Sequence, residues 1–242
     1  MNCQYCGASL APDSRFCSSC GRPQTNEGSE GSPGGAPPNQ QPPLPQPGFV
    51  PPAGVQVHTG RWIGAGWEMV KSDLGIFVLM SLVFMILNSL VPLILQGSLI
   101  AGFHIVCAKK LLDGRSEFAD LFKGFNFFVP TLVACLIITC FTFVGSIFCI
   151  IPGLVIAAMY QFAYLFIIDK KMDFWPAMQA SHAIVKNDYF GFTLFFVALA
   201  LLNIVGVLCC IVGVLATMPI LFAAVTVAYK EIVGFESNVN FG

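Results

Sequence analysis

Three long uncharged stretches constrain the fold of this chain more than any other feature. Residues 74–108, 124–168 and 189–229 contain no Asp, Glu, Lys or Arg and are rich in Phe, Leu, Ile and Val. A helix needs about 20 apolar residues to cross a bilayer, so each stretch is too long for one span and suits a helical hairpin. The pattern predicts an all-α polytopic membrane domain with about six transmembrane helices arranged as three hairpins.

Gly, Pro and Asn residues mark the expected turn of each hairpin, at residues 88–97, 145–153 and 206–213. The first stretch is the shortest, and it leaves only about 17 residues for each helix with none for the turn. Two arrangements therefore stay open. Either all three hairpins cross the membrane fully, or four full spans accompany a re-entrant first pair.

Charge placement predicts the orientation of the chain. All 12 Lys and Arg and all 13 Asp and Glu lie outside the three stretches, and charged residues make up only 10% of the sequence. Because an even number of crossings separates the charged segments, they share one side of the membrane, which the positive-inside rule makes cytoplasmic. We expect an integral protein of the bacterial inner membrane with both termini in the cytoplasm.

A short amphipathic segment precedes each hairpin and is expected to lie as a helix in the cytoplasmic interface. The apolar stripes of these segments are Ile63, Trp67, Val70 and Leu74; Phe118, Leu121, Phe122 and Phe125; and Phe174, Ala177, Ser181, Ile184 and Val185. Matched positions recur between copies: residues 70–73 with 185–188, and Ala108, Lys110 and Gly114 with Ala228, Lys230 and Gly234. These matches predict three degenerate copies of one unit, an interfacial helix followed by a hairpin.

Four cysteines near the N-terminus have the spacing of a zinc site. Two CxxC pairs, each followed by Gly, supply the thiolates of a closed, tetrahedral, structural Zn²⁺ site: Cys3, Cys6, Cys17 and Cys20. Such a short segment buries too little surface to fold unaided, so the bound metal would provide the folding free energy. Two disulfides are the alternative, which a reducing cytosol disfavours.

The sequence CQYCGASLAPDSRFCSSCGRP closely resembles the zinc-ribbon modules at the N-termini of many bacterial membrane and regulatory proteins, and the resemblance covers residues 1–22. It implies zinc binding but no particular function. Arg15 and Arg22 are the only cations and Asp13 opposes them, so no basic face for nucleic acid is expected. Residues 23–57, rich in Pro, Gly, Gln, Asn and Ser, are predicted to be a disordered linker that leads to an integral membrane domain at 58–236.

Within the membrane domain, four segments resemble poorly characterised bacterial integral membrane domains related to the membrane portion of glycerophosphodiester phosphodiesterases. The segments are PLILQGSLIAGFHIVCAKKLLDGR, CIIPGLVIAAMYQFAYLFIID, AMQASHAIVKND and MPILFAAVTVAYKEIVG. The similarity covers about residues 60–235 and implies the hairpin architecture. It implies no activity, because the phosphodiesterase catalytic domain has no counterpart here.

Few polar residues occur within the predicted spans. His104 is expected near the cytoplasmic interface, and Gln161 and Asn203 are expected to hydrogen-bond across helices. The cysteines of this region are expected to be small packing residues rather than metal ligands: Cys107, Cys135, Cys140, Cys149, Cys209 and Cys210. The lack of charged residues within the spans disfavours a coupled transporter.

No constellation of residues predicts catalysis. His58, His104 and His182 lie in separate segments, and the adjacent Ser181 and His182 project about 100° apart on a helix. One group of charges is interpreted as a solvated interfacial cluster: Asp169, Lys170, Lys171 and Asp173. The chain is therefore not expected to be an enzyme.

The favoured hypothesis is a non-enzymatic membrane scaffold or regulator, in which the membrane domain anchors a cytosolic zinc ribbon that binds a protein partner. The expected partners are the lipid bilayer and a cytosolic or membrane protein, with no nucleic acid, and the oligomeric state stays open. The alternative is a transporter, channel or lipid-handling protein, favoured by the pseudo-repeats and by the glycine and proline breaks.

Overall fold

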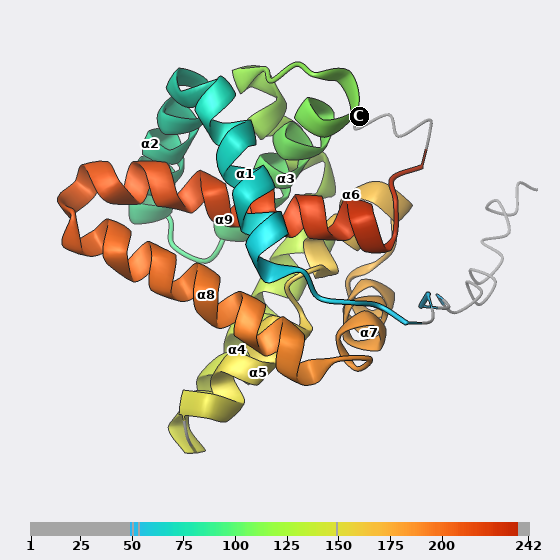
Figure 1. The fold of residues 1–242 in the computed structure, drawn as a ribbon. Coiled ribbons are helices and arrows are strands. Elements are labelled where there is room, and N and C mark those ends of the chain that lie inside the picture. The colour runs from blue at the N-terminus through green and yellow to red at the C-terminus, as the bar shows by residue number, and fades with distance from the viewer. Residues whose placement is uncertain (1–48, 50, 53, 149, 237–242) are drawn as a thin grey trace, which may run out of the picture. The chain divides into compact units, whose positions relative to one another are not determined.

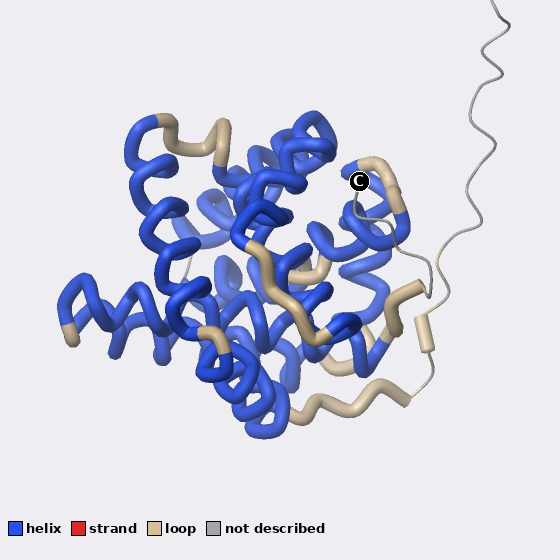
Figure 2. Tube along the Cα trace, turned by 90° about the horizontal axis from the view of Figure 1, so that it is seen from above, coloured by secondary structure: helices blue, strands red, loops and turns tan. Residues whose placement is uncertain are grey.

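The computed structural model describes residue 49, residues 51 and 52, and residues 54–148 and 150–236 (Figures 1 and 2). The four predicted zinc ligands and most of the predicted linker lie outside the described residues. The described part contains helices and no strand. The helical segments in chain order are α1 (Thr59–Ser72), α2 (Leu74–Leu90), α3 (Gln96–Asp113), the 3₁₀ helix η1 (Phe118–Phe127), α4 (Phe128–Phe148), α5 (Ile150–Met159), α6 (Ala163–Lys170), α7 (Phe174–Val185), α8 (Tyr189–Leu208) and α9 (Cys210–Ile232).

The same order of elements occurs three times along the chain, in agreement with the predicted repeat. A short helix precedes a pair of apolar helices in each copy: α1 before α2 and α3, η1 before α4 and α5–α6, and α7 before α8 and α9. Matched residues take matched positions. Val70 and Val185 are both fully buried at the ends of their short helices, and Asp73 and Asp188 are both the N-cap residues of the helices that follow.

The ends of the first and third copies also correspond. Gly114, which follows α3, and Gly234, which follows α9, have positive φ angles of 71° and 76°. A residue with a Cβ is strained in this left-handed conformation, which explains why glycine occurs at both positions. Lys110 and Lys230 each stand four residues before one of these glycines. The Lys110 ammonium donates a hydrogen bond to the Gly114 carbonyl, and the Lys230 ammonium donates one to the Leu111 carbonyl, both at the end of α3.

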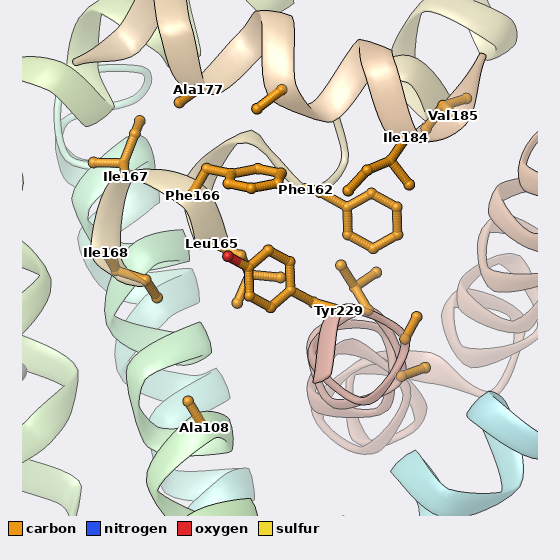
Figure 3. Packing of buried hydrophobic residues seen from close by; sticks show 14 of the residues in the cluster. Ala108, Phe162, Leu165, Phe166, Ile167, Ile168, Ala177, Ile184, Val185 and Tyr229 are labelled. Atoms are coloured by element: carbon orange, nitrogen blue, oxygen red, sulfur yellow. The ribbon is translucent and has the colours of Figure 1, made fainter. Parts of the chain in front are cut away.

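The second apolar segment of each pair is more buried than the first. In the most apolar part of segments 151–170 and 213–232, 56% and 50% of the residues are buried. The corresponding shares for segments 118–147 and 189–208 are only 17% and 22%. The inner helices meet in one apolar cluster, where the Tyr229 ring of α9 packs on Phe166 of α6 (Figure 3). The outer helices leave large apolar side chains exposed, as expected for surfaces that contact lipid: Leu79, Ile86, Phe143, Ile147, Phe190, Leu201 and Leu208.

Four helical segments of the described part are long and apolar enough to cross a membrane, namely 118–147, 151–170, 189–208 and 213–232. A fifth would arise if α1 and α2 together formed one span, but they are bent by 98° where they join. The structure is therefore consistent with a membrane protein. Fewer than the six predicted helices of the described part are long and apolar enough to span a membrane.

The difference arises in the first uncharged stretch. α2 has only 17 residues, and α3 contains Gln96, Ser98 and His104 among its apolar residues. The two helices do not form a tight hairpin, because α2 packs mainly on α9, whereas α3 packs on η1, α4 and α9. Figure 1 shows that α8 and α9, by contrast, pack on each other next to the turn that joins them and diverge from there.

The described end of the predicted linker is packed rather than free. The Phe49 ring lies 4.8 Å from the Phe166 ring, measured between centroids, and Val55 and Val57 pack on the same apolar cluster. The linker prediction therefore needs correction at this end. Its composition becomes apolar at Phe49, so the last residues before α1 have side chains that the helical core can bury.

Candidate functional site

The N-terminal half of α3 and the 3₁₀ helix η1 lie in backbone contact. A Cβ atom on Gly102 would stand 1.9 Å from the Leu121 carbonyl oxygen, and one on Gly124 would stand 2.1 Å from the Ser98 carbonyl oxygen. Only glycine leaves room for two backbones this close. The contact brings the charged end of α3 against the charged residues of the segment that follows, and we call this group the charged corner: Asp73, Lys109, Lys110, Ser116, Asp120 and Lys123.

Asp120 is the buried centre of the charged corner. The residue is only 1% exposed, and its Oδ1 accepts hydrogen bonds from Lys109 Nζ at 2.7 Å and from Lys123 Nζ at 3.0 Å. The bond to Asp120 raises the pKa of Lys109. The second carboxylate oxygen, Oδ2, is buried and has no hydrogen-bond partner within the described residues. An unsatisfied buried acceptor costs about 1–3 kcal/mol, so its occurrence beside two lysines requires an explanation.

Asp73 forms the other half of the charged corner. Its Oδ2 accepts a short hydrogen bond from Lys110 Nζ and another from Ser116 Oγ at 2.6 Å. These bonds join the α1–α2 junction to the end of α3 and to the loop after it. The bond from Lys110, followed by the bond from Ser116, holds the pKa of Asp73 below its ordinary value.

This contact predicts a loss of stability in acid. The folded-state pKa of Asp73 is depressed, so its contribution to the free energy of unfolding is fully present above the unfolded-state pKa of about 3.9. This contribution is lost as the pH falls through the folded-state pKa. Asp73→Asn should therefore flatten the fall in thermal stability below about pH 4. Unfolding temperatures of the detergent-solubilised chain across this range, with the surface variant Glu68→Gln as control, would test the expectation. An unchanged pH profile in Asp73→Asn would contradict it.

A cavity of about 360 Å³ opens beside Asp120. Its lining consists of charged residues of both signs: Lys109, Asp113, Arg115, Glu117 and Asp120. Asp113, Arg115 and Glu117 are exposed and form no ion pair with any described residue. The described residues include no group of three or more His, Cys, Asp or Glu positioned to hold a metal ion.

The polar residues singled out within the predicted spans are mostly packing groups. His104 lies in the core at 2% exposure, and its Nδ1 is 2.8 Å from the Thr226 hydroxyl of α9. Asn203 Oδ1 accepts a hydrogen bond from Thr217 Oγ1 at 3.3 Å, which joins α8 to α9 as expected. Gln161 differs, because its amide is buried and neither polar atom has a partner among the described residues.

Gln161 lies at a break in the apolar segment 151–170, between α5 and α6. Ser181 of α7 stabilises this break: its hydroxyl donates to the Met159 carbonyl at 2.7 Å and accepts from the Phe162 amide at 3.2 Å. Ser181 is thus a structural residue whose hydroxyl replaces helix hydrogen bonds. Its neighbour His182 instead bonds to the Tyr189 hydroxyl at 2.6 Å, so the two side chains do not form a pair.

The interpretation of Asp169 as a solvated charge is wrong. Asp169 is only 3% exposed, because the last turn of α6 directs its carboxylate toward α9, where the Tyr229 hydroxyl donates to it at 2.8 Å. The Lys170 ammonium forms ion pairs with Asp169 and with the exposed Glu236, and its Nζ lies 2.8 Å from Glu236 Oε1. The second pair lowers the pKa of the Glu236 carboxyl. The pair therefore joins α6 to the segment after α9.

The cysteines of the helical domain are free thiols where the structure describes them. Cys107 and Cys135 are buried, and Cys140 and Cys209 are exposed on α4 and at the start of α9. Cys149 and the Cys210 side chain, together with Cys3, Cys6, Cys17 and Cys20, lie outside the described residues.

Sequence reasoning did not identify Asp120 or the cavity beside it. The signal in the sequence is the dense run of charges of both signs between residues 109 and 123, which indicates the orientation of the chain but not which charges pair. The distance between Lys109 and Asp120 is set by Gly102 and Gly124, and no spacing rule connects these glycines before the fold is known.

These features define a helical protein with several membrane-length helices and an N-terminal zinc ribbon. The family model described as a zinc-ribbon domain matches residues 2–24, so the chain carries that domain at its N-terminus. A zinc ribbon implies structural zinc. Residues 2–24 lie outside the described part, so the fit of the metal is judged from the donor set alone, and four thiolates in two CxxC pairs fit Zn²⁺.

The chain is also similar to proteins of mycobacteria. An uncharacterized protein of Mycobacterium bovis (strain ATCC BAA-935 / AF2122/97) is 30% identical over 125 residues, which cover 51% of this chain and 38% of that protein. Uncharacterized proteins of two Mycobacterium tuberculosis strains, CDC 1551 / Oshkosh and ATCC 25618 / H37Rv, are also 30% identical over 125 residues. The chain thus matches well under half the length of these relatives. No solved structure matches the chain.

Proposed function

We propose that the chain is a non-enzymatic integral membrane protein of the bacterial inner membrane, a scaffold or regulator whose helical domain anchors a cytosolic zinc ribbon that binds a protein partner. The observation that carries the proposal is the union of a zinc-ribbon domain at residues 2–24 with a domain whose outer helices expose apolar side chains. A closed four-thiolate site has no open position for substrate, which favours a structural metal and a binding role for the ribbon.

The contacts within the helical domain support an anchoring role. His104, Ser181 and Asn203 bond to neighbouring helices or to helix carbonyls, as residues that hold a bundle together do. We further propose an even number of crossings with both termini cytoplasmic, either six spans or four spans plus a re-entrant α2–α3 pair. The resemblance to the membrane portion of glycerophosphodiester phosphodiesterases is consistent with either arrangement.

Removal of residues 1–46 tests the role of the ribbon. This deletion is preferable to one that ends at residue 57, because Phe49, Val55 and Val57 pack on the helical core and residues 47–242 form one compact unit. The truncated chain should still insert into membranes and unfold at the same temperature, but it should lose the protein that crosslinks to the full chain in intact cells. Full-length Cys3→Ser should lose the same partner. A crosslinked partner that persists in both variants would refute the proposal.

A transporter, channel or lipid-handling protein is the second candidate. The specific observation in its favour is the break at residues 160–162, where the Gln161 amide, which has no partner among the described residues, lies inside an otherwise apolar segment. Liposomes reconstituted with the chain lacking residues 1–46 should show flux of a small solute or lipid if this candidate is correct. Flux that Gln161→Leu abolishes, while the fold is kept, would favour it over the scaffold.

A further inference from the structure

The first turn of α3 lies beside the first turn of α4. Ser98 Oγ is 3.3 Å from Thr131 Oγ1, and a Cβ on Gly97 would stand 2.4 Å from the Thr131 carbonyl oxygen. At the other end of α3, the Lys109 ammonium donates to Asp120. The segment from Asp120 to Thr131 therefore runs antiparallel to α3 and matches the whole apolar length of that helix.

α4 continues far beyond this level. Seventeen of its residues follow Thr131, and at 1.5 Å per residue they extend about 25 Å. The hydrocarbon core of a bilayer is about 30 Å thick, so this part of α4 is almost long enough to cross by itself. If α4 crosses the membrane, the start of α3 therefore lies close to the side from which α4 enters.

α9, a second neighbour of α3, also extends past the start of α3. The Phe103 ring stacks on the Phe222 ring with centroids 4.9 Å apart, and the Lys230 ammonium donates to the Leu111 carbonyl, so α3 and α9 run in the same direction. α3 has seven residues before Phe103, whereas α9 has 12 before Phe222. The turn that joins α8 to α9 therefore lies beyond the level at which α3 begins.

The α2–α3 pair begins and ends at one place, the charged corner. Asp73, the N-cap residue of α2, is paired there with Lys110, which lies near the end of α3. α2 has only 17 residues, and its exposed large apolar side chains follow one another at helical spacing: Leu79, Leu82, Ile86 and Leu90. α2 therefore presents an apolar stripe to lipid over its length, although its partner α3 is buried in the protein.

The turn between α2 and α3 is strained and apolar. Leu93 has a φ of 69°, and the Ile94 amide donates to the Pro92 carbonyl at 2.9 Å, which is the hydrogen bond of a strained γ-turn. The Val91 amide bonds back into α2, and Pro92 has no N–H. Two amides of the turn are thus bonded and a third is absent, which lowers the cost of placing the turn against hydrocarbon. Its exposed side chains are all aliphatic: Leu90, Leu93 and Ile94.

We propose that α2 and α3 form a re-entrant hairpin, which enters the cytoplasmic leaflet with its turn foremost and returns to the cytoplasmic side. Leu90, Leu93 and Ile94 contact the acyl chains of that leaflet, and the helical domain has four full crossings rather than six. The inference rests on the membrane location and orientation in the proposed function. It also explains why leucine occupies a position where glycine would relieve the strain, because the turn needs an apolar side chain there.

Cysteine labelling of the full chain in spheroplasts tests the crossing. Four thiols of the helical domain are first replaced by serine: Cys140, Cys149, Cys209 and Cys210. A single cysteine is then introduced as Leu93→Cys or, beside the α8–α9 turn, as the matched control Leu208→Cys, since both leucines are exposed. A membrane-impermeant maleimide added outside should label the control and leave residue 93 unlabelled. Labelling of both would overturn the proposal, because α2 and α3 would then cross. If the control also stayed unlabelled, α8 and α9 would not cross, and the proposed orientation would fail together with this inference.

A spin label at residue 93 measures the contact with lipid. In the purified Leu93→Cys chain in liposomes, the label should collide more often with oxygen, which partitions into hydrocarbon, than with a water-soluble nickel chelate. A label introduced through Glu68→Cys, at an exposed position of α1, should show the reverse. Equal nickel access at the two positions would place the turn in water and overturn the proposal. Unfolding temperatures equal to that of the unsubstituted chain would show that both variants are folded.

Discussion

Cys3→Ser should reduce the zinc content of the purified chain from about one ion per molecule to almost none, because a structural site of this kind requires all four thiolates. Loss of the metal should unfold the ribbon, since the binding free energy of such sites, about 10–16 kcal/mol, is also their folding free energy. Elemental analysis of the purified protein measures the first effect, and protease sensitivity of residues 1–22 measures the second.

Cys140→Ser is the matched control, because Cys140 is an exposed free thiol on α4. It should keep the full zinc content. The disulfide alternative makes the opposite prediction, namely a metal-free chain whose intact mass is lower by the hydrogens lost to two disulfides. That result in protein prepared without reductant and without chelator would rule out the zinc site.

Gly102→Ala should destabilise the helical domain by about 3 kcal/mol, because the new Cβ would overlap backbone rather than a side chain that could move aside. The atom it would meet is the Leu121 carbonyl oxygen, at 1.9 Å. The intrinsic preference of helices for alanine recovers about 1 kcal/mol at most and does not reverse the sign. Thermal or denaturant unfolding of the solubilised chain measures the change.

Gly64→Ala provides a matched control within α1, because a Cβ there would meet no atom within 4 Å. This variant should be neutral or more stable by up to about 1 kcal/mol. If Gly102→Ala were as stable as Gly64→Ala, α3 and η1 would have to lie farther apart than the structure places them, and the charged corner would lose its geometric basis.

Sequence patterns predicted the kind of fold well because the bilayer imposes strong rules on composition. The three uncharged stretches, the amphipathic segments before them and the repeat at residues 70–73 and 185–188 correspond to helices in the expected order. The number of spans was less predictable. Hydropathy does not distinguish a helix that faces lipid from one that is buried by other helices, and α3 is of the second kind.

The candidate site was less accessible to sequence reasoning than the fold. Asp120 resembles any interfacial acid until Gly102 and Gly124 bring η1 onto α3 and exclude water from it. Asp169 illustrates the same limit, because its partner Tyr229 is 60 residues away in the chain. A charge at the end of a hydrophobic stretch can face solvent or another helix, and only the packing of distant segments decides between them.

The central position of α9 has a consequence for biogenesis. α9 packs on α1, α2, α3 and α8, and its Thr226 pairs with His104 across 122 residues of sequence. Among the described helices α9 is synthesised last, so α3 is made with a polar imidazole whose partner is not yet present. The contacts that α9 makes with α1, α2 and α3 therefore form late in synthesis, after the first copy of the unit is complete.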